Sequence, residues 1–209
     1  MIAVLTGDVI GSSRVPARRL TRSLESALSL RGMRSSKALG HQIFRGDSFQ
    51  LAIGRPEAGL AATLYVTCAL KLDLPDGARI AVAVGEARLA RGGFRGDGPA
   101  FRESGRLLDR IKPMRRRILV HTPWPEVNEE LAVTCRFLDG LIEQWTPSQA
   151  GAILGLLRGR KQEAIAKTEG ISQSAVAQRL RRANAAAIKA ALARFSDLVN
   201  TNIRPKLNK

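Results

Sequence analysis

The chain has 209 residues, of which 44% are hydrophobic, enough to build one or two ordinary cores. Its 34 Lys and Arg residues against 18 Asp and Glu residues give a net charge of +16, which favours an anionic partner such as nucleic acid. Only 4% of the residues are aromatic, which argues against a stacking platform for single-stranded nucleic acid.

Two further observations indicate the cellular compartment of the protein. No segment has the roughly 18 consecutive apolar residues of a membrane span, so we expect no membrane partner. Cys68 and Cys135 lie far apart and in no metal-ligand spacing, and we interpret both as buried thiols of a reducing compartment. These features predict a cytoplasmic protein.

Residues 1–122 are expected to alternate strands with helices. The apolar run at residues 2–5 is typical of a buried strand and leads through Thr6 and Gly7 to Asp8. Helices are expected at residues 14–31, 58–72 and 99–111, and further strands at 41–45, 48–53, 79–84 and 116–121. This βαββαβαβ order predicts an α/β (α+β) domain close to the ferredoxin-like plan.

The rest of the chain is predicted to be helical. Residues 123–145 carry one basic and five acidic residues, and we interpret them as an acidic connector helix. Residues 146–209 carry 12 basic and three acidic residues and are expected to form an all-α DNA-binding domain. Its last helix is predicted to continue from residue 183 to 200.

Residues 162–183 have the sequence pattern of a helix-turn-helix. Ile165 and Ala166 suit the core side of a first helix, Gly170 suits the left-handed residue that ends it, and Ser172 suits the N-cap of a second helix. The side chains expected to meet the major groove or the phosphates are Ser172, Gln173, Ser174, Gln178, Arg179, Arg181 and Arg182. The alternative is a helical hairpin with a solvated basic face.

Two carboxylates stand at predicted strand ends: Asp8 after the first strand, and Asp47 beside Gly46 in a predicted β-hairpin. Carboxylates on adjacent strands can converge on Mg²⁺, which also binds the phosphates of nucleotides. The alternative makes Asp8 a helix cap and Asp47 a turn residue.

Each half of the chain resembles known proteins. Gln-Glu-Ala-Ile-Ala at residues 162–166 and Gly-Ile-Ser-Gln-Ser-Ala-Val at 170–176 resemble the promoter-reading domain of sigma factors and related regulators. The positions of Asp8 and Asp47 resemble the metal-binding aspartates of class III nucleotide cyclases and related palm domains. The resemblance implies a cyclase-like sheet domain that holds Mg²⁺ and a nucleotide.

Over nearly its full length the chain resembles the SatD family. The similar segments are residues 3–13, 45–50, 97–101 and 104–109, together with the helix-turn-helix. That family consists mainly of bacterial proteins thought to be regulatory, so the resemblance implies a regulator.

The predicted nucleotide site departs from active cyclases. Ile43 stands where those enzymes commonly carry a lysine, and Arg102 and Arg106 stand where they use an asparagine and an arginine. A guanidinium binds phosphate but does not replace an amide that orients a ribose. We therefore expect Arg102, Arg106 and Gly46 to bind nucleotide and assign no catalytic residue; solvated arginines on a helix face are the alternative.

The sequence thus predicts a homodimeric bacterial transcription regulator that binds double-stranded DNA. Its cyclase-like domain is expected to bind nucleotide and Mg²⁺ or to serve dimerisation, through the helix at residues 58–72 or the connector helix. The alternative function is a nucleotide cyclase or nucleotidyltransferase targeted by its helix-turn-helix domain.

Overall fold

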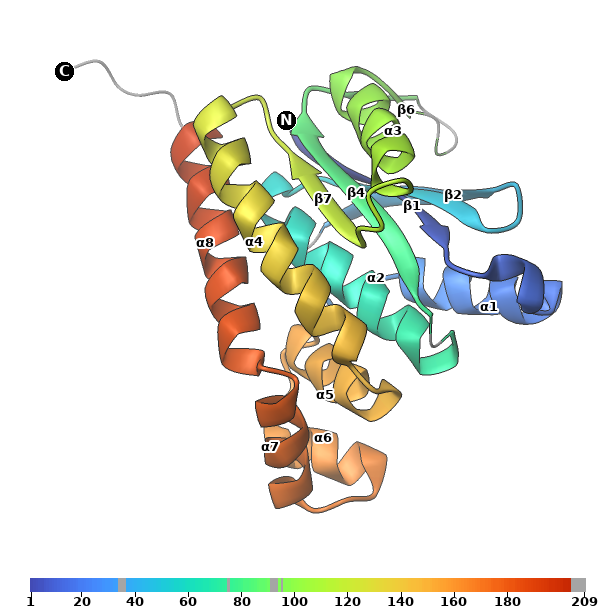
Figure 1. The fold of residues 1–209 in the computed structure, drawn as a ribbon, viewed down its shortest axis with the longest axis vertical. Coiled ribbons are helices and arrows are strands. Elements are labelled where there is room, and N and C mark those ends of the chain that lie inside the picture. The colour runs from blue at the N-terminus through green and yellow to red at the C-terminus, as the bar shows by residue number, and fades with distance from the viewer. Residues whose placement is uncertain (34–36, 75, 91–93, 95, 204–209) are drawn as a thin grey trace.

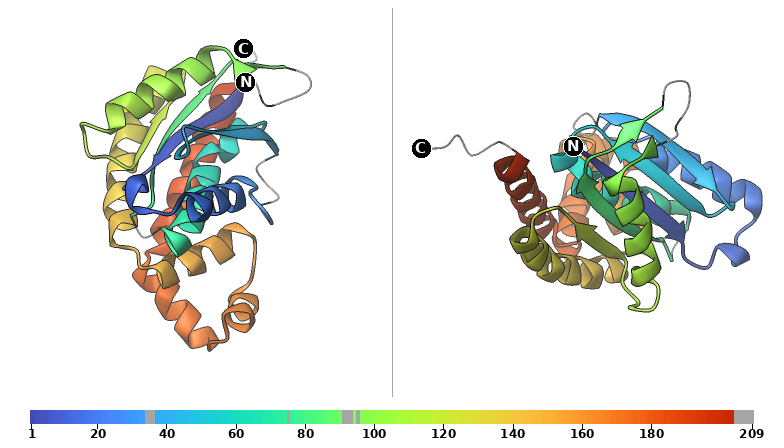
Figure 2. Two further views of the ribbon diagram at one scale, coloured as in Figure 1. Left: turned by 90° about the vertical axis from the view of Figure 1, so that its right-hand side faces the viewer. Right: turned by 90° about the horizontal axis from the view of Figure 1, so that it is seen from above.

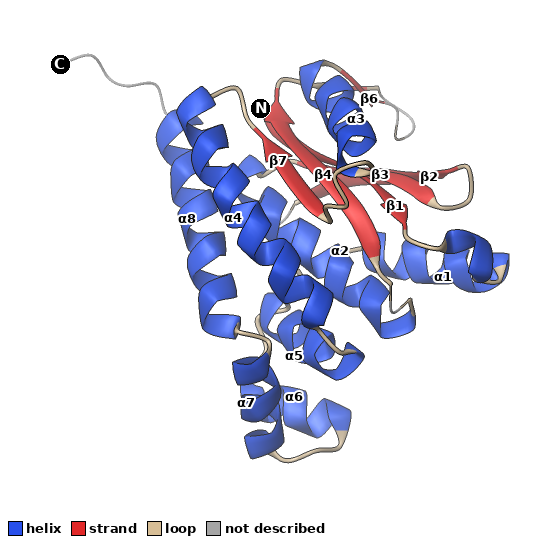
Figure 3. Ribbon diagram, in the orientation of Figure 1, coloured by secondary structure: helices blue, strands red, loops and turns tan. Residues whose placement is uncertain are grey.

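The structure is a computed structural model that describes residues 1–33, 37–74, 76–90, 94 and 96–203. Its N-terminal part combines a mixed five-stranded sheet with helices, and its C-terminal part is helical (Figures 1 and 3). The predicted succession of strands and helices over residues 1–122 is therefore confirmed. A short hairpin that was not predicted, β5 and β6, precedes the third long helix (Arg88–Leu89 and Gly96–Asp97).

The sheet is built around β1, which pairs on both sides. The strands lie in the order β2-β3-β1-β4-β7, and all neighbours are antiparallel except β4 and β7, which are parallel. Their bounds are Ile2–Val9 for β1, Ala38–Phe44 for β2, Ser48–Ile53 for β3, Ala78–Gly85 for β4 and Ile118–His121 for β7. β1 is central because seven of its eight residues are buried, which suits an apolar strand covered on both faces.

Helices cover both faces of the sheet, as the two turned views show (Figure 2). Leu5 and its neighbours of the same parity face α1 (Ala17–Leu28) and α2 (Gly59–Asp73). Val4 faces the opposite way and packs with Ala100 and Phe101 of α3 (Pro99–Ile111). Because side chains alternate along a strand, Thr6 and Asp8 share the α3 face with Val4.

Two single-turn helices complete the connections in this part. They are η1, Ser12–Arg14, after β1 and η2, Pro56–Ala58, before α2. α2 is buried almost all round: eleven of its fifteen residues are buried. The proposal that its apolar face makes a dimer contact is therefore wrong, because that face is already packed inside the protomer.

The helical part contains five helices in the described chain. They are α4 (Pro125–Gln144), α5 (Pro147–Leu157), α6 (Gln162–Glu169), α7 (Gln173–Arg182) and α8 (Ala185–Ile203). α5 packs on α2, and Arg158 at its end donates two hydrogen bonds to the Tyr65 hydroxyl, at 3.2 and 3.0 Å. One buried apolar cluster runs from the sheet through α2 to α5, α7 and α8, so the two parts of the chain share a core.

The last helix differs from the prediction. The chain was expected to stay helical from residue 183 to 200, but it breaks at Asn184, whose φ of 57° lies in the left-handed region that asparagine tolerates. α8 then runs back beside α4, where Arg194 donates to both carboxylate oxygens of Glu130 (Figure 1). Buried Phe195 reaches the start of α2 at Gly59.

Candidate functional site

The turn between α6 and α7 has the local geometry predicted from the sequence. Gly170 ends α6 with φ 66° and ψ 33°, and its N–H donates to the carbonyl oxygen of Ala166. Ser172 caps α7, where its Oγ accepts from the N–H of Ala175 at 3.1 Å. Such a cap provides an acceptor for one of the N–H groups that the first turn of α7 leaves unpaired, and so marks where the helix begins.

α7 has one face in the core and one in solvent. Val176 and Leu180 are buried, as predicted. Ser174, Gln178 and Arg182 follow each other at i+4 spacing on the opposite side of the helix. The predicted DNA-contact residues that are exposed are Ser172, Gln173, Ser174, Gln178, Arg181 and Arg182.

Arg179 is placed differently from the other predicted DNA-contact residues. It is only partly exposed, and its Nη1 forms an ion pair with Oε2 of Glu169, the last residue of α6. A carboxylate at a helix C-terminus opposes the helix dipole, and the guanidinium of Arg179 compensates both. In this arrangement Arg179 ties α7 to α6 instead of standing free for a base or a phosphate.

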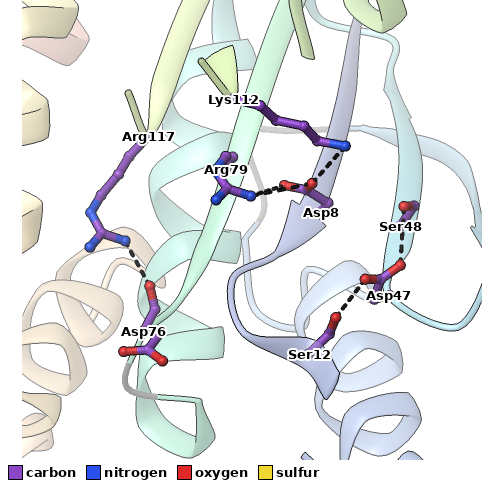
Figure 4. Close-up of polar contacts among 8 residues, drawn as sticks. All are labelled: Asp8, Ser12, Asp47, Ser48, Asp76, Arg79, Lys112 and Arg117. Atoms are coloured by element: carbon purple, nitrogen blue, oxygen red, sulfur yellow. Dashed lines mark hydrogen bonds and ion pairs between the residues drawn. The ribbon is translucent and has the colours of Figure 1, made fainter. Parts of the chain in front are cut away.

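Asp8 lies at the end of β1 beneath α3, and it is 7% exposed. Nη1 of Arg79 lies 3.3 Å from Oδ1 of Asp8, and Nζ of Lys112 lies 3.1 Å from Oδ2 (Figure 4). Arg79 is the residue paired with Asp8 across β1 and β4, and Lys112 follows the end of α3. The buried carboxylate is thus neutralised from within the chain.

Asp47 belongs to the turn between β2 and β3, next to the end of β1. The N–H of Val9 donates to the Asp47 carbonyl oxygen at 3.1 Å, so Asp8 and Asp47 come from adjacent strand ends, as predicted. The Asp47 carboxylate accepts from the hydroxyls of Ser12, at 2.6 Å, and Ser48, at 3.3 Å. In Figure 4 the Asp8 side chain is directed at its two cations, and the Asp47 side chain is directed at the hydroxyls.

These surroundings bear on the predicted metal site. Across the described residues no group of three or more His, Cys, Asp or Glu side chains is arranged to hold a metal ion. Asp8 and Asp47 would act as ligands only if Arg79 and Lys112 moved away from Asp8, because a cation entering there meets two positive charges. Gly46 has a φ of 81°, and beyond its chain neighbours no atom of the described residues lies within 4 Å of an added Cβ, so its left-handed conformation serves the turn.

Arg102 and Arg106 lie on α3 and line a cleft whose described lining includes neither Asp8 nor Asp47. α3 begins against Gly85, which pairs with Ile2, and its middle lies over Thr6, whose hydroxyl oxygen is 2.7 Å from that of Ser104. Both arginines line a cleft of about 490 Å³ together with His121, and Arg102 forms an ion pair with Asp97 at 2.7 Å. The structure therefore does not bring the predicted phosphate-binding arginines to the predicted metal site.

The two cations beside Asp8 were missed by sequence reasoning. Arg79 is the second residue of a strand, and Lys112 stands directly after a helix, so neither has a local pattern that marks it as a partner of Asp8. The signal that would have revealed Arg79 is the register of β1 against β4. That register depends on the strand order and is not contained in either strand alone.

The two cysteines are free and buried, as predicted. Burial raises the pKa of the Cys68 thiol. Burial, with the neighbouring charge of Asp139, raises the pKa of the Cys135 thiol to about 12. Both therefore stay protonated at neutral pH and act as packing groups, since the thiolate is the nucleophile.

Comparison with known proteins adds no relative: no protein-family profile, curated protein or solved structure matches the chain. Among the helices of the described residues, none has the length and apolar character needed to cross a membrane.

Proposed function

We propose that the protein is a bacterial transcription regulator that binds double-stranded DNA through α6 and α7. The observation that carries this proposal is the Ser172-capped helix α7, whose outer face presents Gln178 and Arg182 while Val176 is buried beneath it. A helix of this kind fits the major groove, where amides read base edges and guanidinium groups bind guanines or phosphates. The net charge of residues 146–209, with 12 basic and three acidic residues, supports the same partner.

Salt dependence tests this function. We expect the double variant Arg181→Ala/Arg182→Ala to weaken duplex binding and to lower the slope of log affinity against log salt by about 2, since each phosphate contact contributes about 0.9. Arg18→Ala/Arg22→Ala, which removes two charges from exposed positions on α1, is the control for nonspecific loss of charge. Equal salt slopes for the wild type and the double variant would count against α7 as the DNA-binding helix.

Point variants are preferable to a truncation at Trp145. Removal of residues 146–209 would uncover the side of α2 on which α5 packs, and it would remove Phe195 from the start of α2. The shortened chain would lose part of its core as well as α7. A loss of DNA binding would then have two causes.

For the N-terminal domain we propose a ferredoxin-like, cyclase-like plan of the SatD type. A βαββαβ unit of that plan has four antiparallel strands in the order β2-β3-β1-β4, and the sheet contains this order. The strand β7 extends the sheet beside β4. In this proposal the domain serves dimerisation or binds a nucleotide with Mg²⁺. The adjacency of Asp8 and Asp47 at neighbouring strand ends is its main support.

A cyclase or nucleotidyltransferase is the second candidate function, and the same adjacency favours it. The cations on Asp8 and the separate cleft that Arg102 lines weigh against it, because the parts of a triphosphate site would have to be assembled from two different places. Calorimetry of ATP binding in the presence of Mg²⁺, on the wild type and on Asp47→Asn, distinguishes these possibilities. Binding that is lost in Asp47→Asn supports a nucleotide site. Release of pyrophosphate from ATP supports the enzyme. Equal affinity for both proteins, or none for either, would leave Asp47 as a turn residue.

The proposal includes a homodimer. With the face of α2 buried, the connector helix α4 is the remaining candidate surface, and it exposes Val133 and Phe137 to 59% and 73%. Large apolar side chains this exposed are suited to an interface. Light scattering at micromolar concentration should give twice the mass of the chain, and Phe137→Glu should halve it. A wild-type monomer, with and without DNA, would contradict the dimer.

A further inference from the structure

A cleft of about 440 Å³ lies where α5 and α6 meet Arg179 of α7 and Leu72 of α2. It is separate from both the outer face of α7 and the carboxylates at the end of β1. Its size is within the range of sites that take small molecules. The chemistry of the residues that line the cleft indicates which class of small molecule it can bind.

The lining carries positive charge that the residues the structure describes do not neutralise. Arg158, Arg160 and Arg179 all line the cleft, and Glu169 is the single acidic residue among the described lining residues. Glu169 is paired with Arg179. Arg158 donates to the Tyr65 hydroxyl and Arg160 donates to the Thr168 hydroxyl at 3.4 Å, and both of these acceptors are neutral. Two guanidinium charges therefore remain for an anion, and Arg binds carboxylate or phosphate strongly because its donors form a planar fork.

The same cleft has an apolar side. Leu154 and Ile165 lie in its wall, each 2% exposed, and Leu72 stands at its edge with 46% of its surface exposed. Gly151 of α5 lies beside this leucine: an added Cβ would be 3.5 Å from Leu72, an ordinary contact distance. A bare inorganic anion would leave the exposed side of Leu72 in water, whereas an anion with an apolar body would cover it.

We propose that this cleft binds a small organic acid, with its apolar body against Leu72, Leu154 and Ile165 and its carboxylate on Arg158 and Arg160. Because Arg179 also lines the cleft and ties α7 to α6, an anion seated there changes the position of α7 and so the affinity for DNA. This second step rests on the proposed DNA-binding function. Thermodynamic linkage then requires DNA to change the affinity for the acid by the same factor.

Calorimetry on the full chain without DNA tests the site. Benzoate is the probe. Benzyl alcohol carries the same aromatic ring without the negative charge, and inorganic phosphate carries negative charge without an apolar group. We expect saturable benzoate binding, at least about ten-fold weaker binding of phosphate, and none of benzyl alcohol. Absent benzoate binding, or phosphate binding as tight as that of benzoate, would overturn the proposal.

Two matched variants place the binding at the cleft. Arg160→Gln should lower the benzoate affinity about ten-fold, the size expected for one charge-assisted hydrogen bond. Arg22→Gln removes the same charge from an exposed position on α1 and should leave the affinity unchanged. Both side chains are exposed, so neither change removes a buried contact, and circular dichroism confirms folding. Equal benzoate affinity in the two variants would refute the assignment.

A DNA titration with and without saturating benzoate tests the coupling separately. The duplex affinity should change in the wild type and in Arg22→Gln but much less in Arg160→Gln. Unchanged affinity in the wild type would refute the coupling. A protein that binds benzoate and no duplex would contradict the proposed function while supporting the organic-acid site, so the two failures are distinguishable.

Discussion

Substitution of Gly7 by alanine tests how closely the central strand β1 is packed against its neighbours. A Cβ on Gly7 would come to 2.4 Å from Cζ of Phe49 and 2.7 Å from the carbonyl oxygen of Arg79, where carbon contacts normally lie near 3.5–4.0 Å. Phe49 is fully buried, and the Arg79 oxygen is backbone of the neighbouring strand, so neither can move aside easily. Overpacking of this kind costs about 1–3 kcal/mol, and we expect the upper half of that range for Gly7→Ala.

Urea denaturation followed by circular dichroism measures this loss, and a thermal scan should show the Tm lowered by roughly 4 to 12 °C for a chain of this size. Gly140→Ala is the matched control: Gly140 lies in α4 with nothing within 4 Å of an added Cβ. The control should gain about 0.5–1 kcal/mol, because alanine is the better helix former. If both variants were as stable as the wild type, or if Gly7→Ala were more stable, the packing of β1 against Phe49 described above would be refuted.

Three further perturbations give separate tests of the fold. Phe195→Ala should reduce the free energy of unfolding by about 3–5 kcal/mol, because Phe195 is 1% exposed and joins α8 to the start of α2; a loss below about 1 kcal/mol would mean that α8 does not pack there. Thr146→Ala should cost about 1 kcal/mol by urea denaturation, because it breaks the reciprocal cap with Gln149 at the start of α5; no cost would show that the cap is not formed in solution. Stability should fall as pH rises from about 9 towards 12, because unfolded thiols ionise near 9.0 while burial keeps the Cys135 pKa at about 12. The alkaline slope of urea stability against pH should be flatter for Cys135→Ala, and an identical slope would contradict the burial of that thiol.

The features that could be predicted from the sequence are those with local causes. The turn at Gly170 and the cap at Ser172 depend on residues within one helical turn, and the structure has both. The apolar run of β1 and the periodic helices were also predictable, because burial imposes a period on each segment by itself. The placement of Asp8 beside Asp47 followed from the order of the first three strands.

The features that could not be predicted depend on contacts between distant segments. Arg79 and Lys112 reach Asp8 through the β1–β4 register and the end of α3, which no local pattern shows. The packing of α3 on the sheet places Arg102 in a cleft whose described lining does not include Asp8, although their motifs suggested a common site. The break at Asn184 lies in an alanine-rich stretch with strong helix propensity, and packing of α8 against α4 and α2 accompanies the turn there.

Selection of duplexes from a random library by the full-length protein tests the central claim most directly. Enriched and scrambled duplexes are then compared by fluorescence anisotropy at fixed salt, for the wild type and for Gln178→Ala. The account predicts an enriched sequence bound at least about 100-fold more tightly than the scrambled one, and loss of preference at one base pair in Gln178→Ala by about 1–3 kcal/mol. No enriched sequence, or the same preference at every base pair in both proteins, would contradict DNA reading by α7.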